Sequence, residues 1–207
     1  MKLVIFGSTG RTGKYLIQFA LEKGYEVTAF ARTPSVIPIH HPRLTVFQGD
    51  ATNESEVEKA VMGKDAVISA IGTDLGKTNL RQVAIHNLIS AMQKHKVKRI
   101  IAIGGMGILQ ANSELKIFET TGFPAEFIPV SKDHNAAFEV LENSGTDYTF
   151  VCPPMIVEGP ITDHFVAAAD YPAKGKLEIT PGDLAWFMIN ELTGKQYIGK
   201  RVGIATL

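Results

Sequence analysis

A glycine-punctuated turn near the start of the chain, Gly7-Ser8-Thr9-Gly10-Arg11-Thr12-Gly13, places the strictest limit on what this sequence can form. It lies between the apolar run 3–6 and a helical-looking stretch that ends at Lys23. Glycine lets the backbone approach a pyrophosphate closely, and the free N–H groups of a helix's first turn point at that anion. The order of strand, glycine loop and helix therefore predicts a nucleotide-binding fold that begins at the first strand. An ordinary tight turn is the alternative.

Length, charge and cysteine content restrict the class of protein. A chain of 207 residues suffices for one well-buried domain spanning 1–207. The 21 basic residues balance the 21 acidic ones, so no long-range field favours nucleic acid or a membrane as a partner. Cys152 is the single cysteine and cannot form an internal disulfide. Since no apolar stretch reaches about 18 residues, we expect a cytoplasmic protein, a monomer by default with a dimer as the alternative.

Alternating strand-length apolar runs and helical segments predict an α/β fold of the Rossmann type, a doubly wound parallel sheet with helices on both faces. The expected strands are 2–6, 26–31, 44–48, 66–70, 99–103, 148–151 and 200–204. The expected helices are 13–23, 53–61, 78–95, 132–143 and 181–192. Asn53 and Glu56 have the spacing of a capping box, and Gly24 stands where a helix would end.

Two long segments, 104–130 and about 153–179, resist assignment to regular structure. Both follow the carboxyl end of an expected strand, which is where open α/β sheets bind ligands. Long loops in a compact domain commonly serve as lids or binding loops, so we expect these two to form a small substrate lid. A short helix is expected in each, over 112–120 and 161–169. Apolar side chains of the first loop would either offer a stackable surface or pack beneath it: Met106, Ile108, Leu109, Phe118, Phe123 and Phe127.

The end of the second strand indicates which dinucleotide the fold would bind. An acid that holds the ribose 2′-OH of NAD is expected there, but the strand ends in Arg32. A guanidinium grips a 2′-phosphate through paired hydrogen bonds, so NADP(H) is favoured over NAD(H), with a solvated surface arginine as the alternative. Asp50-Ala51, after the third strand, suits an adenine ring or a simple turn. Ile71-Gly72-Thr73, after the fourth strand, would let a cofactor lie against the backbone, unless it is only a tight turn.

An ordered set of motifs covers nearly the whole chain and is more specific than the glycine turn alone. These motifs are Ile5-Phe6 with the glycine turn, Gly24-Tyr25-Glu26-Val27-Thr28, Arg32, Gly49-Asp50-Ala51, Gly63-Lys64-Asp65-Ala66-Val67-Ile68, Ile71-Gly72-Thr73, Asp133-His134, Leu141-Glu142-Asn143-Ser144-Gly145 and Pro153-Pro154. With them the chain resembles the atypical short-chain dehydrogenase/reductases. Within that group it is similar to the flavin reductases and biliverdin-IXβ reductases, with their NADH-flavin-reductase-like and NmrA-like relatives.

The resemblance implies an NADPH-dependent enzyme that passes hydride to a planar acceptor. That acceptor would be a flavin such as FMN or riboflavin, held as substrate rather than prosthetic group, or else a quinone or linear tetrapyrrole. The resemblance implies that the pyrophosphate of the cofactor is held by the glycine turn, through Gly7, Thr9, Gly10, Arg11, Thr12 and Gly13. Arg32 would bind the 2′-phosphate, and Asp50 and Ala51 would bind the adenine. Ile71, Gly72 and Thr73 would line the middle of the cofactor, and Pro154 and Ile156 would lie near the nicotinamide. The implied catalytic residue is His134, and the implied substrate residues are Gly105, Met106 and Met155.

The sequence also departs from the family's pattern. The Tyr-x-x-x-Lys pair is absent, and His134 stands where the lysine usually falls. Val36 replaces a second arginine, Gly104-Gly105 replace Thr-Ser, and Met155 replaces a histidine. Fewer polar groups beside the substrate make biliverdin reduction doubtful and favour an alternative function, an NADP(H)-sensing binding protein of the NmrA-like type. An epimerase is disfavoured because that chemistry needs a positioned acid and base.

The remaining reactive side chains predict no further chemistry. His134 would hydrogen-bond the nicotinamide ribose or relay a proton, since an unperturbed imidazole titrates near pH ~6.5, or it would have no chemical role. His40-His41 and His95 have no partner at ligand spacing, so no metal site is expected. Ser8 and Ser131 have no base at a recognisable spacing, and hydrolysis is unsupported.

Overall fold

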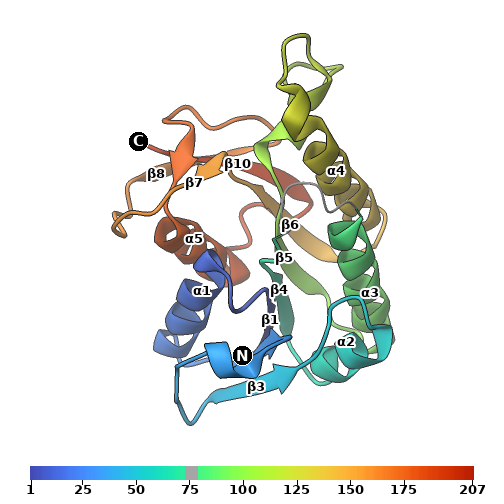
Figure 1. Ribbon diagram of the computed structural model, residues 1–207, viewed down its shortest axis with the longest axis vertical. Coiled ribbons are helices and arrows are strands. Elements are labelled where there is room, and N and C mark those ends of the chain that lie inside the picture. Colours follow the sequence, from blue (N-terminus) through green and yellow to red (C-terminus); the bar gives the residue numbers. More distant parts are fainter. Residues whose placement is uncertain (73–78) are drawn as a thin grey trace.

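The computed structural model describes residues 1–72 and 79–207, whose main sheet has the strand order β3-β2-β1-β4-β5-β6-β10-β8 (Figure 1). Its strands are β1 (Lys2–Phe6), β2 (Glu26–Ala31), β3 (Leu44–Gln48), β4 (Ala66–Ser69), β5 (Arg99–Ile103), β6 (Asp147–Cys152), β8 (Phe165–Ala169) and β10 (Lys200–Thr206). A separate pair joins β7 (Met155–Ile156) to β9 (Glu178–Ile179). The helices are α1 (Arg11–Glu22), α2 (Glu54–Val61), α3 (Leu80–Lys94), α4 (Ile128–Glu142) and α5 (Pro181–Gly194).

Strand β1 lies at the centre of a parallel arrangement. Val4 of β1 is in register with Thr28 of β2 on one side and with Val67 of β4 on the other. The order 3-2-1-4-5-6 is that of a dinucleotide-binding sheet, in which the chain reverses its direction of growth between β1 and β4. The predicted doubly wound fold is confirmed, and the glycine turn lies at this reversal point.

Helices cover both faces of the sheet because β1 is apolar on both of its sides. Leu3 and Ile5 are buried in a core shared with α1 and α5, whereas Val4 and Phe6 are buried in a second core under α2, α3 and α4. A strand flanked by helices on both faces is continuously apolar, and the run 3–6 has this pattern. Figure 1 shows α1 beside α5 on one face and α3 beside α4 on the other.

Local turn signals were partly correct. Gly24 follows the end of α1 with a φ of 81°, a conformation that favours glycine. Asn53 caps α2 by accepting a hydrogen bond from the Glu56 N–H at 3.2 Å. The reciprocal half of the capping box was predicted wrongly, because the Glu56 carboxylate accepts from the Asp50 N–H at 2.7 Å instead.

The two loop segments contain more regular structure than the sequence indicated. The helix expected over 161–169 is wrong: Phe165–Ala169 is strand β8, which pairs antiparallel with β10. Over 112–120 only Ile117–Glu119 is helical, as a single 3-10 turn. Helix α4 begins at Ile128, four residues before its predicted start, and has Pro129 in its first turn, where the missing N–H costs nothing. The segment 153–179 therefore carries three short strands.

Buried Asp183 fastens the second loop to the start of α5. Its carboxylate accepts hydrogen bonds from the Thr162 N–H at 2.8 Å, the Asp163 N–H at 2.9 Å and the Thr180 hydroxyl at 2.9 Å. Burial raises the pKa of this carboxyl, but the hydrogen bonds outweigh burial and the net pKa is lowered. The loop that was expected to act as a lid is thus tied to a helix of the core.

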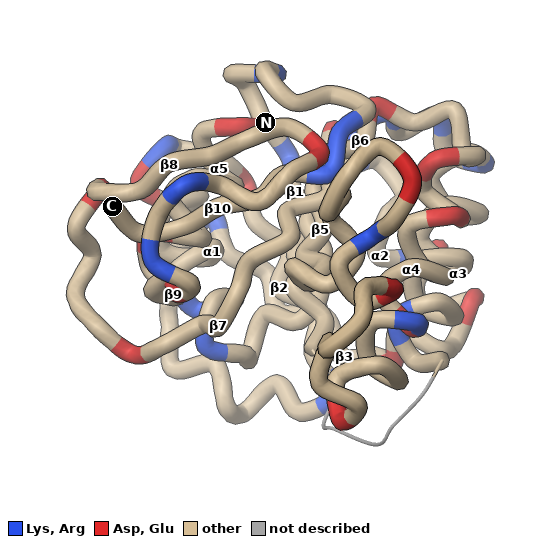
Figure 2. Tube along the Cα trace, turned by 90° about the horizontal axis from the view of Figure 1, so that it is seen from above, with Lys and Arg blue, Asp and Glu red and all other residues tan. Residues whose placement is uncertain are grey.

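Charge is spread over the surface without a dominant sign. Basic and acidic residues are interspersed along the trace in Figure 2, in keeping with a formal net charge of zero. Within residues 1–72 and 79–207, every helix is too short or too polar to traverse a membrane.

Candidate cofactor and acceptor site

Two glycines of the turn are required by the space around them. Gly7 has a φ of 75°, and a Cβ placed on it would lie 2.3 Å from the Ala70 carbonyl oxygen at the end of β4. A Cβ on Gly13 would lie 2.2 Å from the Gly7 carbonyl oxygen. The loop is therefore closed on itself, with the Gly10 N–H donating to the Gly7 carbonyl at 3.1 Å. This compact turn brings the start of α1 to the carboxyl edge of the sheet.

The first turn of α1 leaves its backbone donors open. Gly10 precedes the helix and has no side chain to cap it, and no acidic residue stands in the first turn. Ser8 does not supply a cap, because its hydroxyl donates to the Phe30 carbonyl at 2.8 Å. Uncapped N–H groups and the positive end of the helix dipole form an anion site of the kind that holds a pyrophosphate.

A hollow of about 120 Å³ beside this turn brings together residues from four strand ends. Its lining includes six of the residues predicted to bind cofactor, namely Gly7, Thr9, Arg32, Asp50, Ala51 and Ile71. Phe6, Phe30, Ala31, Gly49 and Leu80 complete it. Buried Phe6, Phe30 and Ala31 give the hollow an apolar lining, and exposed Arg32 and half-buried Asp50 carry its charges.

Arg32 and Asp50 face the same hollow with opposite charges. The Asp50 carboxylate accepts hydrogen bonds from the Thr52 N–H at 2.9 Å and the Thr52 hydroxyl at 2.8 Å, the pattern of an Asx turn. These two bonds, with a smaller contribution from the positive charge of Arg32, lower the Asp50 pKa despite some burial. Asp50 is thus both the turn residue and a fixed negative charge at the hollow, and its contact with adenine stays a prediction.

Sequence reasoning missed the residues that hold this hollow in shape. The Asn87 side-chain amide of α3 donates to the Ala51 carbonyl at 3.0 Å, and Glu56 fixes the Asp50 N–H from α2. Phe30 fills the space beside Gly49, where a Cβ would lie 2.5 Å from the ring. Asn87 is buried on α3, and an asparagine on the buried face of a helix is the sequence signal that could have indicated a polar role.

The residues after β4 are placed only in part. Ile71 lies at the hollow. A Cβ on Gly72 would meet no heavy atom within 4 Å, so the protein's own packing does not require glycine there. Thr73, also predicted to line the cofactor, lies outside the described residues.

Arg11 connects the glycine turn to the second loop. Its Nη1 donates to the Ile156 carbonyl at 2.9 Å and lies 3.6 Å from the Glu158 carboxylate. Two residues predicted to bind cofactor, Arg11 and Ile156, are thus in contact with each other. The guanidinium spans from the first turn of α1 to strand β7.

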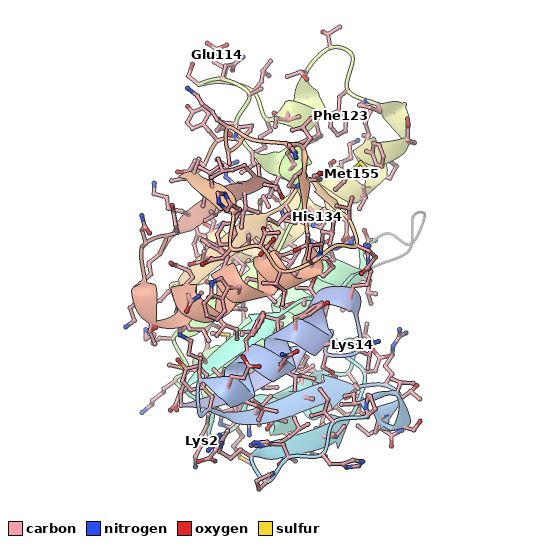
Figure 3. All side chains as sticks on the ribbon, turned by 90° about the vertical axis from the view of Figure 1, so that its left-hand side faces the viewer. Lys2, Lys14, Glu114, Phe123, His134 and Met155 are labelled. Atoms are coloured by element: carbon pink, nitrogen blue, oxygen red, sulfur yellow. The ribbon has the colours of Figure 1, made fainter. Side chains whose placement is uncertain are left out.

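On the acceptor side, glycines of the β5 exit pack directly against neighbouring side chains. A Cβ on Gly104 would lie 2.8 Å from the Phe150 ring, and one on Gly105 would lie 2.9 Å from the His134 ring. A Cβ on Gly107 would lie 2.5 Å from the Ser131 hydroxyl. Side chains of β6 and α4 therefore fill the space that side chains at these three glycine positions would take. Figure 3 shows His134, Met155 and Phe123 in the same half of the molecule, away from Lys2.

His134 is a buried, neutral imidazole. Its side chain projects from α4, the residue is only 8% exposed, and Nδ1 has no hydrogen-bond partner among the described residues. Burial, and secondly the positive charge of Arg81, lower the pKa of His134 to about 3. The expectation of an ordinary imidazole pKa is therefore corrected. His134 can donate or accept one hydrogen bond, but it cannot release a proton near neutral pH.

Lowering the pH should destabilise the protein through His134. Its pKa is about 3 in the folded chain and 6.5 when unfolded, so between these values only the unfolded chain gains the proton. Stability should fall as the pH drops below 6.5, by about 2 kcal/mol at pH 5. Urea unfolding at pH 7.5 and pH 5 measures this loss. His134→Gln should remove most of it, and an equal loss in both proteins would contradict the assignment.

The remaining acceptor-side residues separate into surface and core. Met155 is 70% exposed, and Met106 is partly buried, with its N–H donating to the Pro153 carbonyl at 3.0 Å. Ile108 and Leu109 are fully buried, so for these two residues the alternative of packing beneath the loop is the one observed. Phe118 packs partly against the core, whereas Phe127 is 44% exposed. Met106 and Met155 thus flank the point where the two loops meet, with Pro154 between β6 and β7.

Other reactive side chains form no second centre. Across residues 1–72 and 79–207, no group of three or more His, Cys, Asp or Glu side chains is arranged to hold a metal ion. Cys152 is buried, and its burial raises the pKa of the thiol to about 12.

The family of the chain follows from comparison with known proteins. Residues 7–195 match the model of the NAD(P)H-binding family. The chain belongs to this family. The Bacillus subtilis protein YwnB is 25% identical over 214 residues, which cover 100% of this chain and 99% of YwnB.

Solved structures agree on the fold of this NAD(P)H-binding protein. The oxidoreductase YlbE of Lactococcus lactis superimposes with a TM-score of 0.84 at 26% identity, covering 100% of this chain and 91% of YlbE. A Streptococcus pneumoniae protein named as a candidate NADH-flavin reductase gives a TM-score of 0.86 at 24% identity and covers both chains fully. The family model and the solved structures thus agree that the chain is an NAD(P)H-binding protein with the Rossmann fold.

Proposed function

We propose that the protein is an NADPH-dependent reductase that transfers hydride to a planar acceptor such as FMN, riboflavin or a quinone. The cofactor preference rests on the position of Arg32, which directly follows β2 and lines the hollow beside the glycine turn. A 2′-phosphate bound there would meet a guanidinium, which pairs with phosphate more strongly than with a hydroxyl.

The residues present fit a dinucleotide. The uncapped start of α1 and the closed turn at Gly7 and Gly13 would bind the pyrophosphate. The apolar side chains of Phe30 and Leu80, which line the hollow, would pack against the adenine ring. When bound, the reduced nicotinamide supplies the hydride. The chain's own part is to fix the dinucleotide along the carboxyl edge of the sheet and to place the acceptor against it.

The acceptor side favours substrates that need no proton from the protein. His134 is neutral and Cys152 keeps its proton, so neither acts as an acid at neutral pH. A reduced flavin or quinone takes its proton from solvent, whereas reduction of a simple carbonyl gains from a positioned acid. Partly buried Met106 and exposed Met155 give an adaptable apolar surface of the kind that contacts a flat ring. His134 would position the nicotinamide or its ribose through one hydrogen bond.

Oxidation of NADPH in the presence of FMN tests the activity directly. The absorbance of the reduced nicotinamide should fall when protein, NADPH and FMN are mixed, and it should stay constant when any one of them is left out. Riboflavin and a quinone should replace FMN. Binding of NADPH without turnover of any of these acceptors would contradict a reductase. It would leave the NADP(H)-sensing alternative, which Gly104, Gly105 and Met155 favour because they carry no polar side chain.

The cofactor preference rests on Arg32. Arg32→Ala should weaken NADPH binding about tenfold, the size of a hydrogen bond to a charged group, while NADH binding changes little. Lys98→Ala is the matched control and should leave both affinities unchanged, because Lys98 is exposed and precedes the amino end of β5, away from the glycine turn. Calorimetric titration with each dinucleotide measures the ratio. An equal effect of Arg32→Ala on NADPH and NADH would overturn the 2′-phosphate role.

A further inference from the structure

Strand β8 leaves one edge of the main sheet open. It is the terminal strand and, among the described residues, pairs only with β10 (Figure 1). Its sequence, Phe165-Val166-Ala167-Ala168-Ala169, contains no charge and no proline. Natural sheets commonly protect such edges with lysine, proline or a bulge, because an open edge is a template for another strand. β8 carries none of these devices.

The backbone N–H and C=O groups of β8 alternate along the strand between the side that faces β10 and the open side. The Asp170 N–H donates to the Arg201 carbonyl at 2.7 Å, and the Leu207 N–H donates to the His164 carbonyl at 3.1 Å. In an antiparallel ladder alternate residues face the same neighbour, so Val166 and Ala168 face β10, together with the His164 carbonyl and the Asp170 N–H. The Asp170 carbonyl instead accepts from the Gln110 N–H at 2.9 Å. The backbone groups of Phe165, Ala167 and Ala169 therefore point outward. Within residues 1–72 and 79–207, one of these outward groups meets a donor: the Ala167 carbonyl accepts from the Tyr197 hydroxyl at 3.5 Å.

We propose that β8 pairs antiparallel with β8 of a second copy of this chain, about a two-fold axis at Ala167. In this register Ala167 faces Ala167, and Phe165 faces Ala169 of the second copy. All three residues are those whose backbone groups point outward. Each would donate and accept one hydrogen bond across the axis, so the two sheets would become continuous. The interface is isologous, the commonest arrangement in soluble dimers.

The flanking residues match the same register. At each end of the paired segment, His164 of one copy would come near Asp170 of the other, which lies just past β8 and has a φ of 62°. Asp170 already contacts the Lys200 ammonium at 3.0 Å, and the imidazole would offer this carboxylate a further hydrogen-bond donor. Tyr171 and Ile161, 47% and 45% exposed, stand just beyond the two ends of β8. In this register the outward hydrogen-bonding groups of β8 match those of a second β8, and His164 and Asp170 flank the paired segment at both ends.

Paired cysteines test the register. Val166 would face Ala168 of the second copy at a Cα separation of about 4.5 Å, within the range of a disulfide. A mixture of Val166→Cys and Ala168→Cys proteins should form a linked heterodimer on mild oxidation, while either protein alone should not. The buried Cys152 does not compete. Failure of the mixture to cross-link, or equal cross-linking of each variant alone, would overturn the proposed register.

Proline at the axis tests the interface. Ala167→Pro removes an N–H that β10 does not use, so the monomer should keep its fold, which circular dichroism measures. The dimer should weaken by about 30-fold or more through loss of the central hydrogen bonds. Sedimentation at micromolar concentrations should give a dimer for the wild-type chain and a monomer for Ala167→Pro. A wild-type monomer, or a variant that remains dimeric, would overturn the proposal. Cofactor titration separates this outcome from the proposed function, because Ala167 lies far from the glycine turn in the strand order.

Discussion

Replacing Gly13 by alanine is expected to weaken NADPH binding by at least about 100-fold, or ~2.7 kcal/mol. The added Cβ would lie 2.2 Å from the Gly7 carbonyl oxygen and 2.8 Å from the Ser8 Cα. Both neighbours are backbone, so the loop itself must move before ordinary contact is restored, and overpacking of this kind costs about 1–3 kcal/mol. The movement displaces the N–H groups that would hold the pyrophosphate. Calorimetric titration with NADPH measures the loss.

The matched control for this variant is Gly194→Ala at the end of α5. A Cβ there would meet its nearest atom, the Glu191 carboxylate, at 3.7 Å, which is ordinary contact. Gly194→Ala should bind NADPH like the wild-type protein. Circular dichroism distinguishes a displaced loop from an unfolded chain. A folded Gly13→Ala protein that binds NADPH normally would show that the glycine turn does not hold the cofactor.

The second large effect is expected at the amino end of β5, where Arg99 contacts Glu191 of α5. Glu191→Ala should destabilise the fold by about 3–5 kcal/mol. Glu191 is buried on α5 and accepts from Arg99 of β5 at 3.2 Å, from the Tyr197 N–H at 2.9 Å and from the Gln196 N–H at 3.1 Å. Its removal leaves the Arg99 guanidinium buried without its counter-charge. For a chain of this length the midpoint of thermal unfolding should fall by about 10 °C.

Two further variants show whether charge is the cause. Glu58→Ala removes a partly exposed partner of Lys94 and His95 and should change stability by less than about 1 kcal/mol. Arg99→Met combined with Glu191→Ala should recover part of the loss, because no buried charge then remains unpaired. A double variant less stable than Glu191→Ala alone would mean that Arg99 stabilises the fold mainly through its bonds to the Asp147 carbonyl and the Thr149 hydroxyl.

Most of the fold could be predicted from the sequence because its signals are local. Strands β1, β4 and β5 are continuous apolar runs, which is typical of a parallel sheet covered on both faces. Glycines mark the ends of the helices that connect the strands. Strand β8 could not be predicted in this way. Phe165-Val166-Ala167-Ala168-Ala169 is short and rich in alanine, so its periodicity does not distinguish a helix from a strand. Pairing with β10, a contact distant in sequence, decides the outcome.

The cofactor half of the site was easier to predict than the acceptor half. Gly7, Thr9, Arg32, Asp50 and Ala51 lie at strand ends that the fold must bring together, and the structure places all five at one hollow. The state of His134 could not be predicted, because an imidazole pKa depends on burial and on Arg81, which lies 53 positions earlier in the chain. The fate of Ile108 and Leu109 also depended on how far the first loop folds into the core.

The three glycines at the β5 exit have a consequence for how this protein can diverge. Because the His134 ring and the Ser131 hydroxyl already occupy the volume beside Gly105 and Gly107, neither position accepts a larger residue by itself. A serine at position 105 demands a smaller residue at 134, and one at 107 demands a smaller residue at 131. At these two positions a side chain must therefore arise through two coordinated replacements, so a library of single-codon changes would not sample it.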